Sequence, residues 1–235
     1  TAGAVALTTA QVQALSTAQL QKLNTTAVSN LKTSQVTAML TAQVNALTQA
    51  QVQNLSTQQV NALLTSQVQA LSTDQVGYLS SAQVKNLTTA QLQTLSSSQI
   101  THVSSSGLTQ LSTAQVVALT TESVSALTNA QVIGLVTAQV SALLTSQVAA
   151  LSTSSIVALE DADLSALTTV QMRALSSGQL QALSAGDVAL LSTAQASSLT
   201  GVQVAALTHF QSVDGNALLP LPDYILAKQP KEPDR

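Results

Sequence analysis

An eight-residue repeat runs through this chain without a single insertion. Every eighth residue from Leu7 to Leu207 is Leu, apart from Met39 and Val103, so the register holds for 26 cycles. Self-similarity at a short fixed period is typical of stacked architectures in which each unit contacts only its neighbours. The repeat therefore predicts a solenoid, in which few positions can differ from the rest.

The consensus, written from its Leu, is Leu-Ser/Thr-Thr-Ala-Gln-Val-x-Ala. The second position is Ser or Thr in 19 of 26 repeats, and the fifth is Gln in 20 of 26. Ser or Thr followed three residues later by Gln is a capping box, in which each side chain satisfies a backbone N–H at a helix start. The Leu and the sixth-position aliphatic residue occupy the two sites of a hydrophobic staple. We predict a short helix that restarts in every repeat, with these two apolar residues buried.

Two alternatives to this interpretation differ in backbone conformation. In one continuous helix the apolar stripe would rotate by roughly 80° per repeat and face no partner, so a bend in each repeat is favoured. No Gly or Pro marks the bend, so we expect it at the Leu or the following Ser/Thr, in the β or polyproline region. A β-solenoid with eight-residue rungs is the main alternative, but it would require alternating β-branched residues and fixed corner residues.

The few charged residues of the array provide an independent check. Of the four bases, Lys22, Lys85 and Arg173 lie at the seventh or eighth position, and only Lys32 lies at the second. The acids all lie at the second to fifth positions: Asp74, Glu122, Glu160, Asp161, Asp163 and Asp187. Acids at helix starts and bases at helix ends are what the helix dipole favours.

The composition limits the possible function classes. A hydrophobic content of 45% excludes a disordered chain, and 1% aromatic residues requires a thin core of Leu, Val and Ala. A net charge of −3 with scattered bases gives no footprint for nucleic acid, and no apolar run is long enough to span a bilayer. The absence of Cys excludes thiolate metal sites.

The C-terminal segment differs from the array. We expect the repeats to occupy residues 1–211 and a Pro-containing segment, 212–235, to form either a cap over the last repeat or a docking tail. Its candidate interaction residues are Leu218, Leu219, Leu221, Tyr224 and Ile225. The chain opens within the repeat phase, like a piece of a longer array, so its first repeat could stack on another molecule.

Candidate chemistry is sparse. Glu160, Asp161 and Asp163 form the one acidic cluster of the array and are candidates for a calcium site, because hard cations bind carboxylate oxygens. They lack the spacing of known calcium loops, and helix capping explains their positions equally well. His102 and His209 are isolated from other ligand types, and no Ser is marked by a base. We therefore expect no cofactor and no enzymatic activity.

Two further patterns have simple explanations. Asn24, Asn54 and Asn86 begin glycosylation sequons, which the repeat generates whenever Asn falls beside it. The consensus decays between Val103 and Gly107, which indicates either a tolerated irregular repeat or a hinge.

The third position carries Thr in most repeats, so regular stacking would arrange these residues in evenly spaced rows. Such rows resemble the flat faces of ice-binding proteins. We expect capping to consume hydroxyl groups at the helix starts, which argues against a binding role. The row begins with Thr9, Thr17, Thr25, Thr33 and Thr41.

The units Leu47–Leu55 and Leu111–Leu119 resemble the octapeptide arrays of very long bacterial secreted or surface-associated proteins. The resemblance covers residues 1 to about 211. It implies an extracellular or cell-surface location and a role as a stalk, spacer or matrix component.

These observations predict an all-α solenoid of about 26 short-helix units. With three units per turn and layers about 10 Å apart, it would form a rod roughly 90 Å long. The expected function is that of a spacer, stalk or self-assembling filament subunit, whose partners are other copies or neighbouring domains. The alternative is a surface-binding module for ice or glycan that uses the Thr rows.

Overall fold

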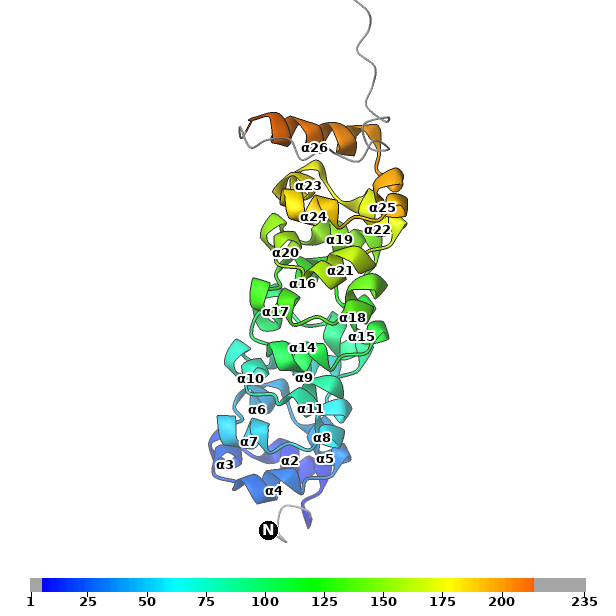
Figure 1. The fold of residues 1–235 in the computed structure, drawn as a ribbon. Coiled ribbons are helices and arrows are strands. Elements are labelled where there is room, and N and C mark those ends of the chain that lie inside the picture. The colour runs from blue at the N-terminus through cyan, green and yellow to red at the C-terminus, as the bar shows by residue number, and fades with distance from the viewer. Residues whose placement is uncertain (1–5, 214–235) are drawn as a thin grey trace, which may run out of the picture. The chain divides into compact units, whose positions relative to one another are not determined.

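The computed structural model describes the backbone of residues 6–213 and the side chains of residues 6–207, which fall into two compact units, Thr1–Ala126 and Leu127–Arg235 (Figure 1). Within the described residues both units contain helices and no strand. The predicted all-α solenoid is confirmed, and the β-solenoid alternative is wrong.

Each unit is a series of short helices joined by two- to four-residue links. The first unit contains α2 (Thr9–Ala14), α3 (Thr17–Gln21), α4 (Thr25–Ser29), α5 (Thr33–Ala38), α6 (Thr41–Asn45), α7 (Gln49–Gln53), α8 (Thr57–Ala62), α9 (Thr65–Ala70), α10 (Thr73–Gly77), α11 (Ser81–Lys85), α12 (Thr89–Gln93), α13 (Ser97–Ile100), α14 (Ser105–Thr109), α15 (Thr113–Ala118) and α16 (Thr121–Ser125). The second contains α17 (Asn129–Ile133), α18 (Thr137–Ala142), α19 (Thr145–Ala150), α20 (Thr153–Val157), α21 (Asp161–Ala166), α22 (Thr169–Ala174), α23 (Ser177–Ala182), α24 (Ala185–Ala189), α25 (Thr193–Ser198) and α26 (Gly201–Val213).

The helix starts are the predicted capping boxes. At α7 the backbone N–H of Gln51 donates to Thr48 Oγ1 over 3.3 Å, and the backbone N–H of Thr48 donates to Gln51 Oε1 over 3.0 Å. Both interactions span three residues, so they form within one repeat and need no tertiary context. Local sequence therefore fixes where each helix begins.

The chain bends between helices at the predicted positions, the Leu of the repeat and the Ser or Thr that follows it. Leu71 ends α9 with φ −60° and ψ 136°, and Ser72 precedes α10 with φ −67° and ψ 163°. Both residues are in extended conformations that any L-residue can adopt. The link therefore needs no Gly, which explains why none recurs at a fixed position.

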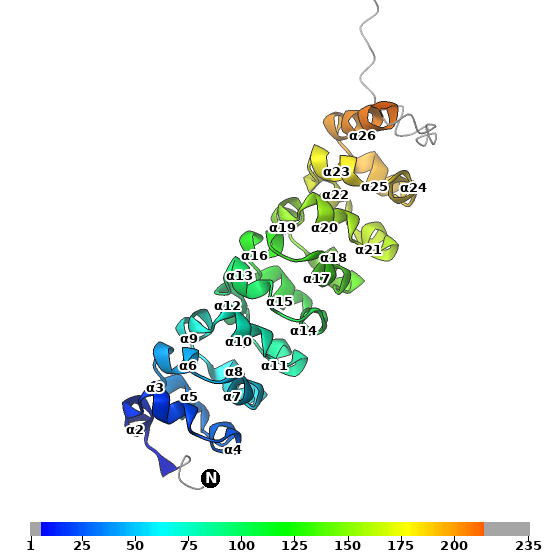
Figure 2. The same cartoon turned by 90° about the vertical axis from the view of Figure 1, so that its left-hand side faces the viewer.

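Each helix packs against the helix three repeats away. Within the first unit α2 contacts α5, α5 contacts α8, and α8 contacts α11, and within the second α20 contacts α23 and α23 contacts α26. This spacing means that three repeats, or 24 residues, complete one turn. The stacking of successive turns inside each unit can be followed in Figure 2.

The core consists of the two apolar positions of the repeat. Val52, Val60 and Leu92 are fully buried, and Leu55 and Leu63 retain only 5% of their surface. The predicted core positions are confirmed.

The last described helix departs from the pattern. A break was expected at Leu207, but α26 continues through it from Gly201 to Val213. The sequence after Leu207 has His209 where Thr usually stands and Ser212 at the sixth position, so the second half of the hydrophobic staple is missing. The capping-box pair, Thr208 and Gln211, is still present in the sequence, so the incomplete staple is what distinguishes this repeat from those that start a new helix.

Candidate functional site: a buried glutamine ladder

The fifth-position Gln connects successive turns of the stack. In α7, Gln51 Oε1 caps its own helix, while Gln51 Nε2 donates to the carbonyl oxygens of Leu20 and Leu23 over 2.8 and 2.9 Å. Leu20 lies in the last turn of α3, and Leu23 lies in the link that follows it. A single side chain thus satisfies a helix N-terminus in one turn and a helix C-terminus in the turn before it.

The same pair of contacts recurs at constant offsets. The donors bind carbonyl oxygens 28 and 31 residues earlier, and most of these side chains expose 4% of their surface or less. We call this set the glutamine ladder: Gln43, Gln51, Gln59, Gln67, Gln75, Gln83, Gln91, Gln99, Gln171, Gln179, Gln195 and Gln203.

The ladder explains why the fifth position holds Gln and never Glu, which helix capping alone does not explain. A capping box accepts Glu or Gln, since only the side-chain carbonyl oxygen is used. No repeat of this chain has Glu at the fifth position. Only an amide supplies N–H donors to the carbonyls below, and a buried carboxylate would face them with like partial charge. The absence of Glu was the sequence signal for the ladder, and sequence reasoning missed it.

Four described helices have an aliphatic residue at the cap. Leu40, Leu64, Val136 and Leu144 occupy the second position, and each still donates its backbone N–H to the Gln three residues later, over 2.8 to 2.9 Å. Their side chains are 42 to 52% exposed. The Gln half of the capping box is therefore sufficient to start a helix in this stack.

A second row of amides lies at the seventh position, which the sequence suggested was unconstrained. Gln21 Nε2, Asn45 Nδ2 and Asn61 Nδ2 donate to carbonyl oxygens 25 residues later in the chain, over 2.8 to 2.9 Å. These bonds lie at the exposed edge of the first unit. They add a further link between successive turns.

The ladder is interrupted at six repeats. The fifth position is not Gln at Ala27, Gly107, Ser123, Ser155, Asp163 and Asp187. Ser123 keeps part of the connection, because its Oγ donates to the carbonyl oxygen of Leu95 over 3.2 Å. Asp187 keeps only the capping function and accepts from the backbone N–H of Ser184 over 2.8 Å.

The predicted acidic cluster is split by the fold. Asp163 is 2% exposed, whereas Glu160 and Asp161 are on the surface. Among the described residues no three acidic or histidine side chains are placed to hold one metal ion together. The three carboxylates therefore do not form the calcium cluster that the sequence left open.

The other candidate residues make local contacts. His102 is exposed, and its Nδ1 lies 2.9 Å from the carbonyl oxygen of Ser98. The sequon residue Asn24 caps α4 by accepting from Ala27, and Asn54 and Asn86 donate to carbonyls four residues earlier in their own helices. The side chain of His209 and the apolar residues Leu218, Leu219, Leu221, Tyr224 and Ile225 lie outside the described residues.

The irregular repeat near residue 105 folds like the others. Val103 is buried, and Ser104 caps α14 by accepting from the backbone N–H of Gly107 over 3.1 Å. A Cβ on Gly107 would lie 3.0 Å from Val84 Cγ2. Gly107 therefore allows the close approach of α14 to α11 at this position.

The third-position Thr residues are not the capping residues. Caps are made by the second position, as in Thr168, which accepts from the backbone N–H of Gln171 over 3.2 Å. Thr169 begins α22 and is exposed. The expectation that capping consumes the third-position hydroxyls is wrong, because the cap lies one residue earlier.

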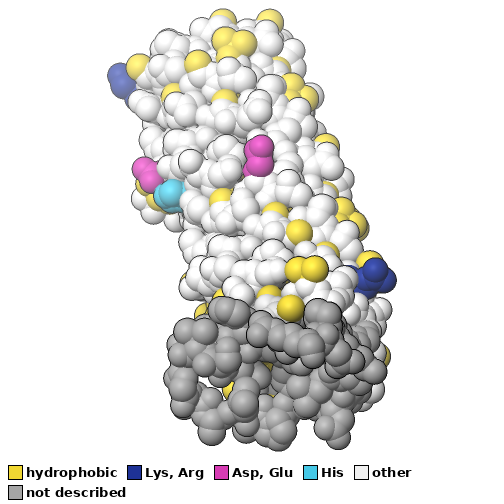
Figure 3. Space-filling view, turned by 90° about the horizontal axis from the view of Figure 1, so that it is seen from above, with side chains coloured by type: hydrophobic (Ala, Val, Ile, Leu, Met, Phe, Trp, Pro, Cys, Tyr) yellow, Lys and Arg dark blue, Asp and Glu magenta, His cyan; other side chains and the backbone are white. Residues whose placement is uncertain are grey.

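In the first unit one row of these residues is unbroken. With three repeats per turn, Thr17, Thr41, Thr65, Thr89 and Thr113 follow one another at 24-residue intervals, and all five are exposed. The face shown in Figure 3 carries only isolated charged side chains. On this face, charged side chains of the described residues are few and far apart.

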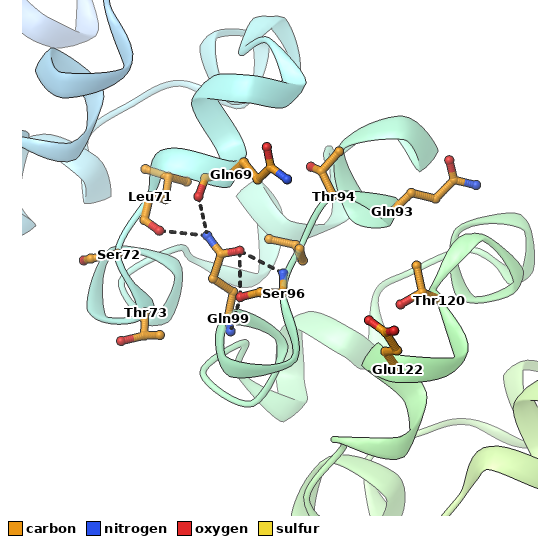
Figure 4. Close-up of a pocket in the computed structure, with 11 residues that line it drawn as sticks. Gln69, Leu71, Ser72, Thr73, Gln93, Thr94, Ser96, Gln99, Thr120 and Glu122 are labelled. Atoms are coloured by element: carbon orange, nitrogen blue, oxygen red, sulfur yellow. Dashed lines mark hydrogen bonds between the residues drawn. The ribbon is translucent and has the colours of Figure 1, made fainter.

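A shallow polar hollow of about 590 Å³ lies on the first unit where α10, α13 and α16 begin. Figure 4 shows Gln99 at its side, with Nε2 bound to the carbonyl oxygens of Gln69 and Leu71. Glu122 and Thr120 lie across the hollow. Hydroxyl and amide walls of this kind can hydrogen-bond to a neutral polyhydroxyl ligand.

This repeat pattern is shared with a known family. Three segments match the ALTTAQ repeat. They are residues 49–81, 57–89 and 156–193, which lie in both units. No curated protein sequence matches the chain. The predicted resemblance to octapeptide-repeat arrays is confirmed, and the chain is a structural repeat module with ALTTAQ-like units.

The helices are too short for a membrane span. In the described part of the chain, none combines the length and apolar character needed to cross a bilayer.

Proposed function

We propose that the chain is a spacer or stalk module of a bacterial secreted or surface protein. The observation that carries this proposal is the glutamine ladder, because its buried amides join each turn to the previous one. An array built this way gains length with every added turn and needs no other element.

The proposed location rests on the resemblance to secreted octapeptide arrays. A surface with few and isolated charged side chains suits a passive connector that should not attract nucleic acid or membranes. Antibodies raised against the chain should label intact cells of the source bacterium or its culture medium. Labelling that appears only after the cells are lysed would contradict this location.

Length is the property that tests the spacer role. Small-angle scattering of the full chain should give an elongated particle, and duplication of residues 57–80 should lengthen it by about 10 Å, one helix layer. A compact particle, or an insertion that widens it without lengthening it, would contradict the proposal. Sedimentation at rising protein concentration distinguishes a spacer from a filament subunit, because a filament subunit associates with other copies and a spacer does not.

A second candidate function is surface binding to a glycan or to ice. It is favoured by the exposed Thr row from Thr17 to Thr113 and by the polar hollow near Glu122. Replacement of Thr41, Thr65 and Thr89 by Val should abolish binding on a glycan array or in a thermal hysteresis assay while leaving the helix content unchanged. No signal from the unaltered chain in either assay would exclude this function.

A further inference from the structure

One column of seventh-position amides, 24 residues apart in the first unit, changes its contacts along the stack. Gln21 Nε2 and Asn45 Nδ2 donate to carbonyl oxygens 25 residues later in the chain. Gln69 and Gln93 occupy the next two turns of the same column, and both are exposed. Neither of these two side-chain amides makes a hydrogen bond within the described residues. Their donors and acceptors are therefore open to a ligand.

Both amides line the polar hollow of the first unit, whose volume of about 590 Å³ is typical of small-molecule sites. Figure 4 shows them with Thr94 between them. Because stacked helices lie about 8 to 10 Å apart, the two amides recur along the stack at about this distance. The lining also includes one hydroxyl residue at the start of each of three successive turns, Ser72, Ser96 and Thr120. The hollow thus presents similar polar groups at successive levels of the stack.

Among the described residues that line the hollow, Glu122 alone carries a charge. Its side chain is exposed and lies across the hollow from Gln99. A carboxylate has two acceptor oxygens and no donor, so it can accept hydrogen bonds from two neighbouring hydroxyl groups of a sugar ring. The same negative charge repels acidic polysaccharides. This combination favours an uncharged ligand that is rich in hydroxyl groups.

We propose that the hollow binds one edge of a linear, uncharged polysaccharide that runs along the stack. This inference rests on the second candidate function, glycan binding, and assigns it to the hollow rather than to the Thr row. A β-1,4-linked glycan presents the same edge at every second sugar, a repeat close to the distance between turns. Gln69 and Gln93 then bind equivalent hydroxyl groups on alternate sugars, and Glu122 accepts from a sugar at the level of the next turn.

Titration of the isotope-labelled full chain with cellohexaose, a linear β-1,4-linked glucan, tests the site by nuclear magnetic resonance. Amide signals of residues 69–73, 93–99 and 120–122 should shift. The Kd should be on the order of 1 mM, because the lining contains no aromatic ring on which a sugar could stack. Cellobiose is too short to engage both amides and should bind about fivefold more weakly.

Two variants remove the proposed contacts, and two matched variants serve as controls. Gln69→Ala combined with Gln93→Ala should weaken cellohexaose binding by about tenfold, and Glu122→Gln by about fivefold. Gln53→Ala changes an exposed seventh-position Gln that does not line the hollow, and Glu160→Gln removes an exposed carboxylate of the second unit. Both controls should leave the Kd unchanged. Circular dichroism should show the same helix content in all four variants, because every altered side chain is exposed.

Three outcomes would overturn the proposal. They are the absence of shifts with cellohexaose, undiminished binding by the double Gln variant, and loss of binding when Thr41, Thr65 and Thr89 are replaced by Val. In the third case the glycan would lie on the Thr row, so glycan binding would stand without the hollow. If the unaltered chain binds no sugar on a glycan array, glycan binding and the hollow fail together.

Discussion

Gln51 Nε2 lies 2.9 Å from the carbonyl oxygen of Leu23, 28 residues earlier in the chain, while Oε1 of the same side chain caps its own helix. The oxygen of this amide accepts a hydrogen bond in its own turn, and the nitrogen donates one to the previous turn. The apolar core comes mainly from two of the eight repeat positions, so little apolar surface is buried per residue and recurrent buried hydrogen bonds supply much of the specificity of stacking.

Gln51→Glu separates the two roles of the amide. The carboxylate keeps the capping acceptor but loses both donors and faces two carbonyl oxygens, so we expect a loss of about 2 to 3 kcal/mol in the free energy of unfolding at pH 7. Denaturant unfolding followed by circular dichroism measures this loss. Gln11→Glu is the control, because Gln11 is exposed and only caps its helix, and it should change stability by less than about 0.5 kcal/mol.

Thr168→Ala and Thr169→Ala make the same chemical change at neighbouring residues. The first removes a hydroxyl that caps a helix, and the second removes one that does not. Both residues are exposed, and only Thr168 accepts from the backbone N–H of Gln171. Thr168→Ala should cost about 1 kcal/mol, and Thr169→Ala should be neutral or slightly stabilising because Ala favours helix. Equal melting temperatures for the two variants would refute this assignment of the cap.

Gly107→Ala should destabilise the first unit by about 1 to 2 kcal/mol, because the added Cβ would lie 3.0 Å from both Val84 Cγ2 and Ser104 Oγ. Gly178→Ala is the matched substitution in the second unit. The nearest atom to its Cβ is Ser176 Oγ at 4.0 Å, so the gain in helix propensity of about 0.5 to 1 kcal/mol should prevail. The two variants should therefore shift the melting temperature in opposite directions.

Leu92→Ala removes a fully buried side chain and should cost about 3 kcal/mol through lost burial and the cavity that it leaves. Leu64→Ala deletes the same atoms from a side chain that is 50% exposed at the start of α9. Its effect should stay below about 0.5 kcal/mol, because its helix start depends on the backbone bond to Gln67. Similar losses for both variants would contradict the assignment of the core.

The sequence by itself determined the helices. Ser72 and Gln75 are three residues apart, as are Thr48 and Gln51, and such contacts form within one repeat whatever surrounds it. The buried Leu and sixth-position aliphatic residues followed from the same local pattern. The last repeat shows the limit of this rule, since α26 continues through Leu207 where the staple is incomplete.

Only the tertiary structure decided how the helices stack. Three repeats per turn and the second contact of Gln51 with Leu23 depend on residues 24 to 28 apart in the chain. Every repeat has nearly the same sequence, so no pattern distinguishes one such offset from another. The angle between successive helices, set by packing of the whole turn, selects the offset and thereby gives the fifth-position side chain its second partner.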